Sequence, residues 1–366
     1  MSHTQSQTKV ITCAGTPYEI GFAHGSGAAD EIHGNMVIYA GFFQDRAKIS
    51  WEQARNRASA YIPLLSAKYP EILEEMKGIA EGAGKGLTMQ DILTLNARSE
   101  LGLTNVADGC TCLGQHGQDG QVFLAQNWDW LQVNLVVLHI IPNNTALRMK
   151  FMSEAGLVGK IGLNSAGVGT LLNGILASAQ CKDKFPIHVL LRRVLQFAAS
   201  FDEAFAIMEE HGLASTCNIV IADAKGRAGS IECSPHGNTV VPLRGDTFPY
   251  VGHTNHLYSP DRPASAKDHP EDNSFTRLAR LEELTRQDNE DGVPPSFDSI
   301  RRRLSDQDGA PYSICLDEPT DGDVGIDRVT TVSTIIMELS RGLVQLTVGR
   351  PCDNPTIIEW AMSGEQ

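Results

Sequence analysis

The chain has 366 residues, of which 42% are hydrophobic, and it carries a formal net charge of −14 at neutral pH. Because phosphate contacts require a concentrated basic face, this charge argues against a nucleic-acid partner. The polar amino terminus lacks the apolar segment of a secretory signal, and no later run approaches the length of a membrane span. The last four residues form no peroxisomal tripeptide. We therefore expect a cytoplasmic rather than peroxisomal protein that does not contact a membrane and whose eight cysteines stay reduced.

The amino-terminal third of the chain has helical periodicity. From Pro17 to about Leu101 the apolar residues recur at helical spacing, which predicts three to five amphipathic helices. A glycine-rich turn at 82–86 ends one of them before Thr88 caps the next. That turn resembles a phosphate-binding loop only weakly, because Ile79 stands where the first glycine of such a loop is required.

Beyond Cys110 the pattern changes to short β-rich segments. We expect an antiparallel meander of strands, then two helices, then three more strands, at 121–125, 135–141, 146–152, 157–162 and 167–172, at 187–199 and 202–211, and at 217–222, 230–233 and 239–242. A helix around Leu278, a short helix opened by Pro294-Pro295-Ser296 and two closing strands at 332–339 and 343–348 follow. The basic run 301–303 is interpreted as the solvated face of the short helix.

This order of elements predicts an α+β fold, a four-layer αββα sandwich with two packed antiparallel sheets between outer helices. The continuous apolar content of 135–141 is typical of a strand buried on both faces. We expect one composite domain with a division at Cys110: a helical region, 1–109, and a strand-rich region, 110–366.

Cys110 is the candidate nucleophile because it lies where the helical pattern gives way to strands. If the bond after Gly109 is cut, Cys110 gains an α-amine beside its thiol. A thiol with a pKa near ~8.5 is mostly protonated at neutral pH, whereas an α-amine with a pKa near ~7.7–8 can act as its base. Gly109 permits the unusual backbone conformation in which the thiol attacks the preceding carbonyl. The alternative for any one cysteine is a small buried hydrophobic residue.

The sequence resembles the acyl-coenzyme A:6-aminopenicillanic acid acyltransferase (isopenicillin N acyltransferase) family of the N-terminal nucleophile hydrolases. The resemblance implies a proenzyme that cuts itself at a Gly-Cys bond, Gly109–Cys110 here, into two subunits that stay together as a heterodimer. It rests on motifs that run in order along nearly the whole chain: CAGTPYEIG from Cys13, LNARSE from Leu95, DGCT from Asp108, QNWD from Gln126, EAGLVGK from Glu154, NSAGV from Asn164, HTNH from His253, YSIC from Tyr312 and GRP from Gly349.

The resemblance also implies roles for individual residues. Cys110 would be the nucleophile of self-cleavage and of acyl transfer, and Asp129 would assist cleavage and hold the new amine. Asn255 would assist the oxyanion, and Ser234 and Ser313 match serines that the family needs for activity. Each position has a structural alternative: a strand-end cap for the aspartate, a turn former for the asparagine and satisfied hydroxyls for the serines.

Two further side chains are substrate-binding candidates. Asn173 is a second oxyanion candidate, and Arg98 could hold a substrate carboxylate with two hydrogen bonds or form a structural ion pair. His253 and His256 lack the further ligands of a recognisable metal motif, so we expect no metal and no cofactor.

The chain departs from the family pattern at two places. Leu316 follows Cys315 where the family has an arginine. The chain therefore lacks a charge that could orient the substrate, and the identity of its substrate does not follow from the resemblance. Cys112 replaces the second threonine after the nucleophile, and its thiol is a weaker hydrogen-bond partner than a hydroxyl, so that cleavage is expected to be slower.

The expected activity is acyl exchange through an acyl-enzyme on Cys110. Its partners would be the small molecules isopenicillin N and 6-aminopenicillanic acid, with acyl-coenzyme A as co-substrate. One alternative is a related amidohydrolase or acyltransferase that acts on another N-acyl or peptide compound. The other is a non-catalytic homologue that folds without maturing.

Overall fold

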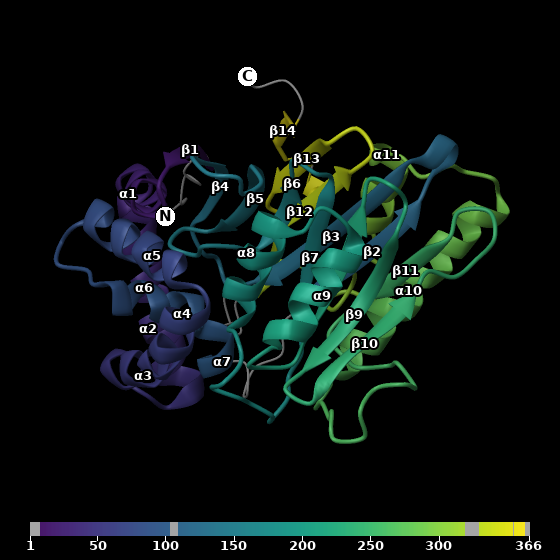
Figure 1. Cartoon of the computed structure of the whole chain (residues 1–366). Coiled ribbons are helices and arrows are strands. Elements are labelled where there is room, and N and C mark those ends of the chain that lie inside the picture. Colours follow the sequence, from purple (N-terminus) through teal and green to yellow (C-terminus); the bar gives the residue numbers. More distant parts are fainter. Residues whose placement is uncertain (1–7, 103–108, 319–328, 354, 363–366) are drawn as a thin grey trace.

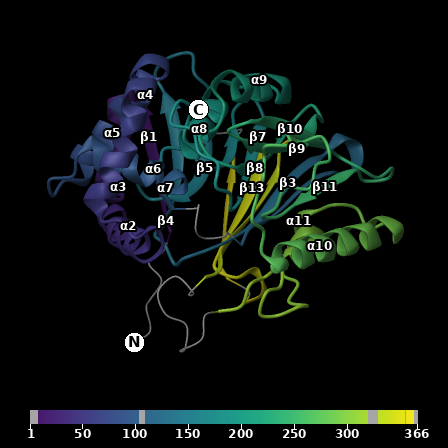
Figure 2. The ribbon, with the colours of Figure 1, turned by 90° about the horizontal axis from the view of Figure 1, so that it is seen from below.

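Two β-sheets packed face to face form the centre of the molecule, and helices cover their outer faces (Figure 1). This computed structural model describes residues 8–102, 109–318, 329–353 and 355–362. Helices α8 (Ile187–Phe197) and α9 (Phe201–His211) cover the eight-stranded sheet. Helices α10 (Asp272–Glu290) and α11 (Phe297–Leu304) cover the six-stranded sheet, as Figure 2 shows from below. The predicted four-layer α+β sandwich is therefore confirmed.

The eight-stranded sheet contains four strands of the predicted meander, β4 to β7, and continues antiparallel to β10. The first strand expected in the meander, 121–125, lies instead in β3 (Val122–Trp130) of the six-stranded sheet, so the meander was wrong at that end. An additional strand, β1, lies parallel to β4 and was not predicted; the expectation of purely antiparallel sheets was therefore wrong at this edge. The order across the sheet is β1 (Lys9–Gly15), β4 (Leu135–Pro142), β5 (Met149–Glu154), β6 (Ile161–Asn164), β7 (Val168–Gly174), β8 (Cys217–Asp223), β9 (Ala228–Ser234) and β10 (Gly237–Pro242).

The six-stranded sheet has two long buried strands, β3 and β12, at its centre. Its order is β11 (Tyr250–His253), β2 (Thr111–His116), β3 (Val122–Trp130), β12 (Thr330–Glu338), β13 (Leu343–Val348) and β14 (Ile357–Ala361). Strands β2, β11 and β14 were missed because they are short and mix polar residues or glycine with apolar ones, so the period of two is weak.

The amino-terminal region forms a helical layer beside the sandwich (Figure 1). The described part contains more helices than the three to five expected. Pro70 begins one of them, and Thr88 caps the next one with Asp91 as predicted. The helices are α1 (Pro17–Gly27), α2 (Ala29–Phe42), α3 (Trp51–Ala58), α4 (Ile62–Lys68), α5 (Pro70–Ala83), α6 (Met89–Asn96) and α7 (Arg98–Gly102), with short π and 3-10 turns η1 (Phe43–Ala47) and η2 (Ser59–Tyr61). Helices α1 and α5 approach each other closely because both carry glycines at the contact, such as Gly21 and Gly78. A side chain at either position would clash with the backbone of the other helix.

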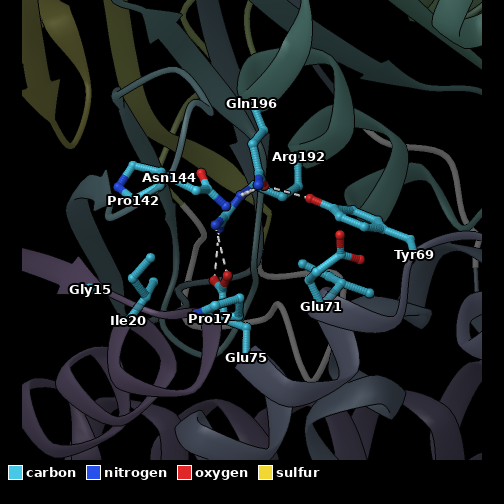
Figure 3. A pocket seen from close by; sticks show the side chains of 11 residues that line it. Gly15, Pro17, Ile20, Tyr69, Glu71, Glu75, Pro142, Asn144, Arg192 and Gln196 are labelled. Atoms are coloured by element: carbon cyan, nitrogen blue, oxygen red, sulfur yellow. Dashed lines mark hydrogen bonds and ion pairs between the residues drawn. The ribbon is translucent and has the colours of Figure 1, made fainter.

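Buried polar contacts join this helical layer to the sandwich, and we call this contact zone the boundary. Arg192 on α8 donates from Nη1 and Nη2 to the two carboxylate oxygens of Glu75 on α5, each at 2.7 Å (Figure 3). The Tyr69 hydroxyl donates to Oε1 of Gln196 at 2.6 Å. On α1, Nε2 of His24 accepts from the backbone N–H of Gly156 at 3.1 Å. Together with the β1–β4 pairing, these contacts bind the segment before Cys110 to the segment after it.

No helix within the described residues is both long and apolar enough to span a lipid bilayer.

Candidate active site

Cys110 lies immediately before β2 and is completely buried. Its carbonyl oxygen accepts a hydrogen bond from Nη1 of Arg277 at 2.8 Å and one from Nδ2 of Asn173 at 3.2 Å. These donors come from α10 in one outer layer and from the end of β7 in the eight-stranded sheet, so a helical layer and a sheet both contribute to this point. The backbone of Cys110 is therefore held from two sides.

Gly109 and Asp129 lie against each other at the predicted cleavage site. A Cβ atom added to Gly109 would lie 2.8 Å from Cβ of Asp129, so that only glycine fits without a shift. Asp129 is buried near the end of β3, and its Oδ1 accepts from Thr331 Oγ1 at 2.6 Å across the β3–β12 pair. Asp108 lies outside the described residues. The carboxylate predicted to hold the new amine is thus beside the bond that would produce it.

The departure at Leu316 lies next to this aspartate. The backbone N–H of Leu316 donates to Thr331 Oγ1 at 2.8 Å, and the same hydroxyl donates to Asp129. The Thr331 hydroxyl therefore links the backbone at Leu316 to the Asp129 carboxylate. Cys112, the other departure, lies on β2 and packs into the core between the two sheets.

Arg277 is a site residue that the sequence reasoning missed. It is 3% exposed, and besides the Cys110 carbonyl it donates to Thr111 Oγ1 at 3.0 Å and to Oδ1 of Asn255 at 2.8 Å. One signal in the sequence could have found it: Arg277 stands beside Leu278 on the apolar face of a helix, a position where a charged residue requires partners.

The two predicted oxyanion candidates are brought close to Cys110. Asn173 Oδ1 accepts from Asn218 Nδ2 at 2.9 Å, and Asn218 Oδ1 accepts from Ser230 Oγ at 2.6 Å. This chain of contacts directs the amide N–H of Asn173 toward Cys110. Asn255 donates from Nδ2 to the Gly174 carbonyl at 2.8 Å and is joined to Cys110 through Arg277.

The two predicted serines are hydrogen-bonded within their own turns. Ser234 Oγ donates to the Gly237 carbonyl at 3.1 Å and accepts from the His236 N–H at 3.1 Å. Ser313 Oγ donates to the Cys315 carbonyl at 2.6 Å. These contacts match the structural alternative for both serines, although Ser313 lies three residues before Leu316, whose N–H contacts Thr331 beside Asp129.

Arg98 forms the ion pair that was the structural alternative for it. Its Nε and Nη2 lie 3.0 Å from Oε1 and 3.0 Å from Oε2 of Glu154, and its guanidinium is 5.2 Å from the ring of Tyr39. Lys160 contacts the same carboxylate at 3.1 Å. Although burial raises the pKa of Glu154, the two cations outweigh it and hold the pKa at about 2. Arg98 thus has a carboxylate partner within the chain.

The two histidines of the HTNH motif take part in a polar network. His253 lies with Nε2 3.2 Å from Oε1 of Glu232 and with Nδ1 2.8 Å from the Thr254 carbonyl. The ring of His256 lies against that of Phe275, with 4.1 Å between the centroids and 34° between the planes, and burial lowers the pKa of His256 to about 4. The described residues contain no group of three His, Cys, Asp or Glu side chains that could hold a metal ion.

Similar proteins are found by sequence and by structure. The chain is 29% identical over 350 residues to the acyl-coenzyme A:6-aminopenicillanic-acid-acyltransferase 40 kDa form of Emericella nidulans, covering 94% of this chain and 93% of that protein. It is 25% identical over 182 residues to an N-acylethanolamine-hydrolyzing acid amidase of Caenorhabditis elegans, covering 44% of this chain and 50% of that protein.

A variant of conjugated bile acid hydrolase from Clostridium perfringens superposes with a TM-score of 0.54 at 15% identity, covering 70% of this chain and 94% of that one. This likeness shows a shared fold. The family model described as acyl-coenzyme A:6-aminopenicillanic acid acyl-transferase matches residues 116–353. The chain therefore belongs to the acyl-coenzyme A:6-aminopenicillanic acid acyltransferase family, whose fold is that of the N-terminal nucleophile hydrolases.

Proposed function

We propose that this protein is a self-processing acyltransferase with amidohydrolase activity, in which Cys110 becomes the amino-terminal nucleophile. The observation that carries the proposal is the arrangement around Gly109–Cys110: a glycine packed on a buried aspartate, followed by a cysteine whose carbonyl is held by two donors. A merely structural cysteine needs neither feature. Membership of the family supports the same reaction class.

Maturation begins with attack of the Cys110 thiol on the Gly109 carbonyl carbon. The C–N bond breaks, the nitrogen becomes the free amine of Cys110, and Gly109 is held as a thioester. Water then hydrolyses the thioester to a carboxylate and a thiol. Asp129, against Gly109, assists this step and afterwards holds the new ammonium in place.

Acyl exchange then uses the same thiol. The α-amine accepts the thiol proton, and the sulfur attacks the amide of isopenicillin N or the thioester of acyl-coenzyme A. The amine or coenzyme A thiol leaves with the proton, and 6-aminopenicillanic acid or water takes the acyl group from Cys110. Amide N–H groups of Asn255 and Asn173 assist the oxyanion, typically by a few kcal/mol in enzymes of this chemistry.

The remaining assignments stay proposals as well. Arg277 positions the Cys110 backbone and the Asn255 amide through its direct contacts with both. Ser234 and Ser313 support activity, as the resemblance implies, through the turns that their hydroxyls stabilise. The reaction uses no metal or cofactor, and acyl-coenzyme A is a co-substrate. We place the mature heterodimer in the cytoplasm.

The test is acylation of purified protein with phenylacetyl-coenzyme A, with and without 6-aminopenicillanic acid. The wild-type chain is expected to form benzylpenicillin, and the Cys110→Ala variant is expected to form none. Mass spectrometry should find a fragment that ends at Gly109 and one that starts at Cys110 in the wild type. Activity from an intact chain would overturn the proposal.

A second candidate is hydrolysis of another N-acyl compound. The partial likeness to an amidase that hydrolyses N-acylethanolamines favours it, as does Leu316, which removes a charge next to the site. In the same assay, release of phenylacetate with no benzylpenicillin would select this candidate.

A further inference from the structure

Two cysteines that are far apart in the sequence have their sulfur atoms in contact. Cys315 ends the YSIC motif, and Cys352 follows the GRP motif in the short turn η5 (Pro351–Asp353). Their sulfur atoms lie 3.0 Å apart, which allows an S–H···S hydrogen bond, and both thiols are free. Because a disulfide bond is about 2.05 Å long, an approach of about 1 Å would join the two sulfurs.

Arg350, the arginine of the GRP motif, bridges the two segments that carry these thiols. Its Nη2 donates to Oδ1 of Asp317, two residues after Cys315, at 3.1 Å. Its Nη1 lies 3.5 Å from Oδ2 of Asp353, the residue after Cys352. The arginine side chain is itself mostly buried. The contact between the two sulfurs is therefore supported by charged groups on both sides.

The two thiols differ in their access to solvent. Cys352 is partly exposed, whereas Cys315 is completely buried. Burial raises the pKa of the Cys315 thiol to about 12, so this thiol stays protonated at neutral pH. A small oxidant from solvent therefore meets Cys352 first, with Cys315 behind it.

Another pair of cysteines lacks this access. Cys217 on β8 is the register partner of Cys233 on β9, and we call these two residues the β8–β9 cysteine pair. Both are completely buried. An oxidant from solvent does not reach them in the folded chain, so they serve as an internal control.

The contact between Cys315 and Cys352 is connected to the candidate active site through the next residue. Leu316 follows Cys315, and its N–H donates to the Thr331 hydroxyl, which in turn donates to Asp129. A disulfide would pull Cys315 toward η5 and shift the Leu316 N–H relative to Thr331. The hydrogen bonding of the Asp129 carboxylate would then depend on the state of the two thiols.

We propose that Cys315 and Cys352 are an oxidation site, at which a peroxide converts the two thiols into a disulfide that slows acyl exchange. The slowing rests on the function proposed above, whereas the disulfide does not.

The reaction takes two steps. The Cys352 sulfur attacks one oxygen of hydrogen peroxide, the O–O bond breaks, and the released hydroxide takes the thiol proton, which leaves a sulfenic acid and water. The Cys315 sulfur then attacks the sulfur of the sulfenic acid, the S–O bond breaks, and the leaving hydroxide takes the Cys315 proton as water. Two thiols and one peroxide thus give one disulfide and two waters, and a reducing thiol reverses the change.

The disulfide is tested first, on the Cys110→Ala chain, because this requires no turnover. The chain is treated with hydrogen peroxide, its remaining thiols are alkylated under denaturing conditions, and its proteolytic peptides are identified by mass spectrometry. A linked peptide that joins Cys315 to Cys352 should appear, and it should disappear after treatment with dithiothreitol. At the same peroxide concentration the β8–β9 cysteine pair should still be alkylated.

Activity is tested second, as the rate of benzylpenicillin formation after peroxide treatment and removal of the peroxide. Cys352→Ser removes one sulfur, and Cys181→Ser replaces another partly exposed cysteine as the matched control. The wild type and Cys181→Ser should become about threefold slower, as expected for one displaced hydrogen bond, and should recover with dithiothreitol. Cys352→Ser should keep its rate. Oxidation of Cys110 would affect all three chains alike, so the difference between them reports the disulfide.

Three results would overturn the proposal: no linked peptide, a disulfide in the β8–β9 cysteine pair at the same peroxide concentration, or an equal loss of activity in the wild type and Cys352→Ser. A protein without activity under reducing conditions would refute the proposed function and, with it, the slowing. The linked peptide would still decide whether the disulfide forms, so the two failures are distinguishable.

Discussion

The active site and the boundary both bury arginine, yet they give it different partners. Arg277 donates to a carbonyl, a hydroxyl and an amide oxygen around Cys110, whereas Arg98 and Arg192 each meet a carboxylate across the boundary. Hydrogen bonds from an arginine to neutral oxygens fix the orientation of the groups that carry them, whereas ion pairs compensate buried charges for the loss of hydration. Substitutions in the candidate active site should therefore change the catalytic rate, and substitutions at the boundary should change the free energy of unfolding.

The largest effect is expected at the boundary from Glu154→Gln. This change leaves Arg98 and Lys160 buried without the carboxylate that both contact, which typically costs about 3–5 kcal/mol of unfolding free energy. Denaturant unfolding followed by circular dichroism measures it. Glu81→Gln, whose partner Tyr18 is on the surface, is the control and should leave the midpoint unchanged. A Glu154→Gln midpoint equal to that of the control would contradict the assigned role of the boundary.

The next effect is expected at the active site from Arg277→Ala. The variant should lose about 10²–10³-fold in kcat, as enzymes do when a preorganised donor is removed. Arg277→Lys should recover part of the rate, and Arg286→Ala on the exposed side of the same helix should change nothing. An unfolding midpoint that drops as far as in Glu154→Gln, with the specific activity of the folded fraction intact, would show that the arginine is structural.

Acid should weaken the boundary through His24. Burial lowers the pKa of His24 from 6.5 to about 3, so the folded state keeps it neutral while the unfolded state binds a proton below pH 6.5. Stability is therefore lost as the pH falls from 6.5 toward 3, by up to about 1.4 kcal/mol per pH unit for one proton. Burial also lowers the pKa of His188 and His256, so these two histidines contribute to the same pH dependence. Between pH 6.5 and 4.5, before Glu154 contributes, His24→Gln should reduce the slope of unfolding free energy by the share of one proton. An unaltered slope would exclude His24 as its source.

The smallest effect is expected from Thr331→Val. The variant removes the hydroxyl between the Leu316 N–H and Asp129, and a net loss of about 1 kcal/mol in the cleavage transition state corresponds to a few-fold slower maturation. Thr331→Ser should restore the rate, as measured by the fraction of cleaved chain over time. Equal cleavage rates in the Thr331→Val and Thr331→Ser variants would show that this hydroxyl has no role in maturation.

The sequence predicted most of what depends on local pattern. Apolar spacing located the two helices on the eight-stranded sheet, and the long apolar strand β4 indicated a sheet buried on both faces. It could not reveal that β1 adds to that sheet, because parallel pairing between Lys9–Gly15 and β4 joins segments far apart in the chain. Strand edges of mixed polarity carry too little periodicity to be found.

The candidate site was also predicted only in part, because some of its contacts join residues far apart in the chain. Gly109 and Cys110 are adjacent in the sequence, and the motifs placed Asp129 and Asn255 near them. Arg277 was missed because its role arises only when α10 packs against the start of β2. Arg98 had two open interpretations, and only the folded chain brings Glu154 to it.

The position of β1 has a consequence for a molecule cut at Gly109. The strand would then belong to one polypeptide while its hydrogen-bonding neighbour β4 belongs to the other. The two polypeptides would share one sheet, and exchange of one for an isotopically labelled copy would require all hydrogen bonds between β1 and β4 to break. Mixed labelled and unlabelled heterodimers should consequently form during folding and not afterwards.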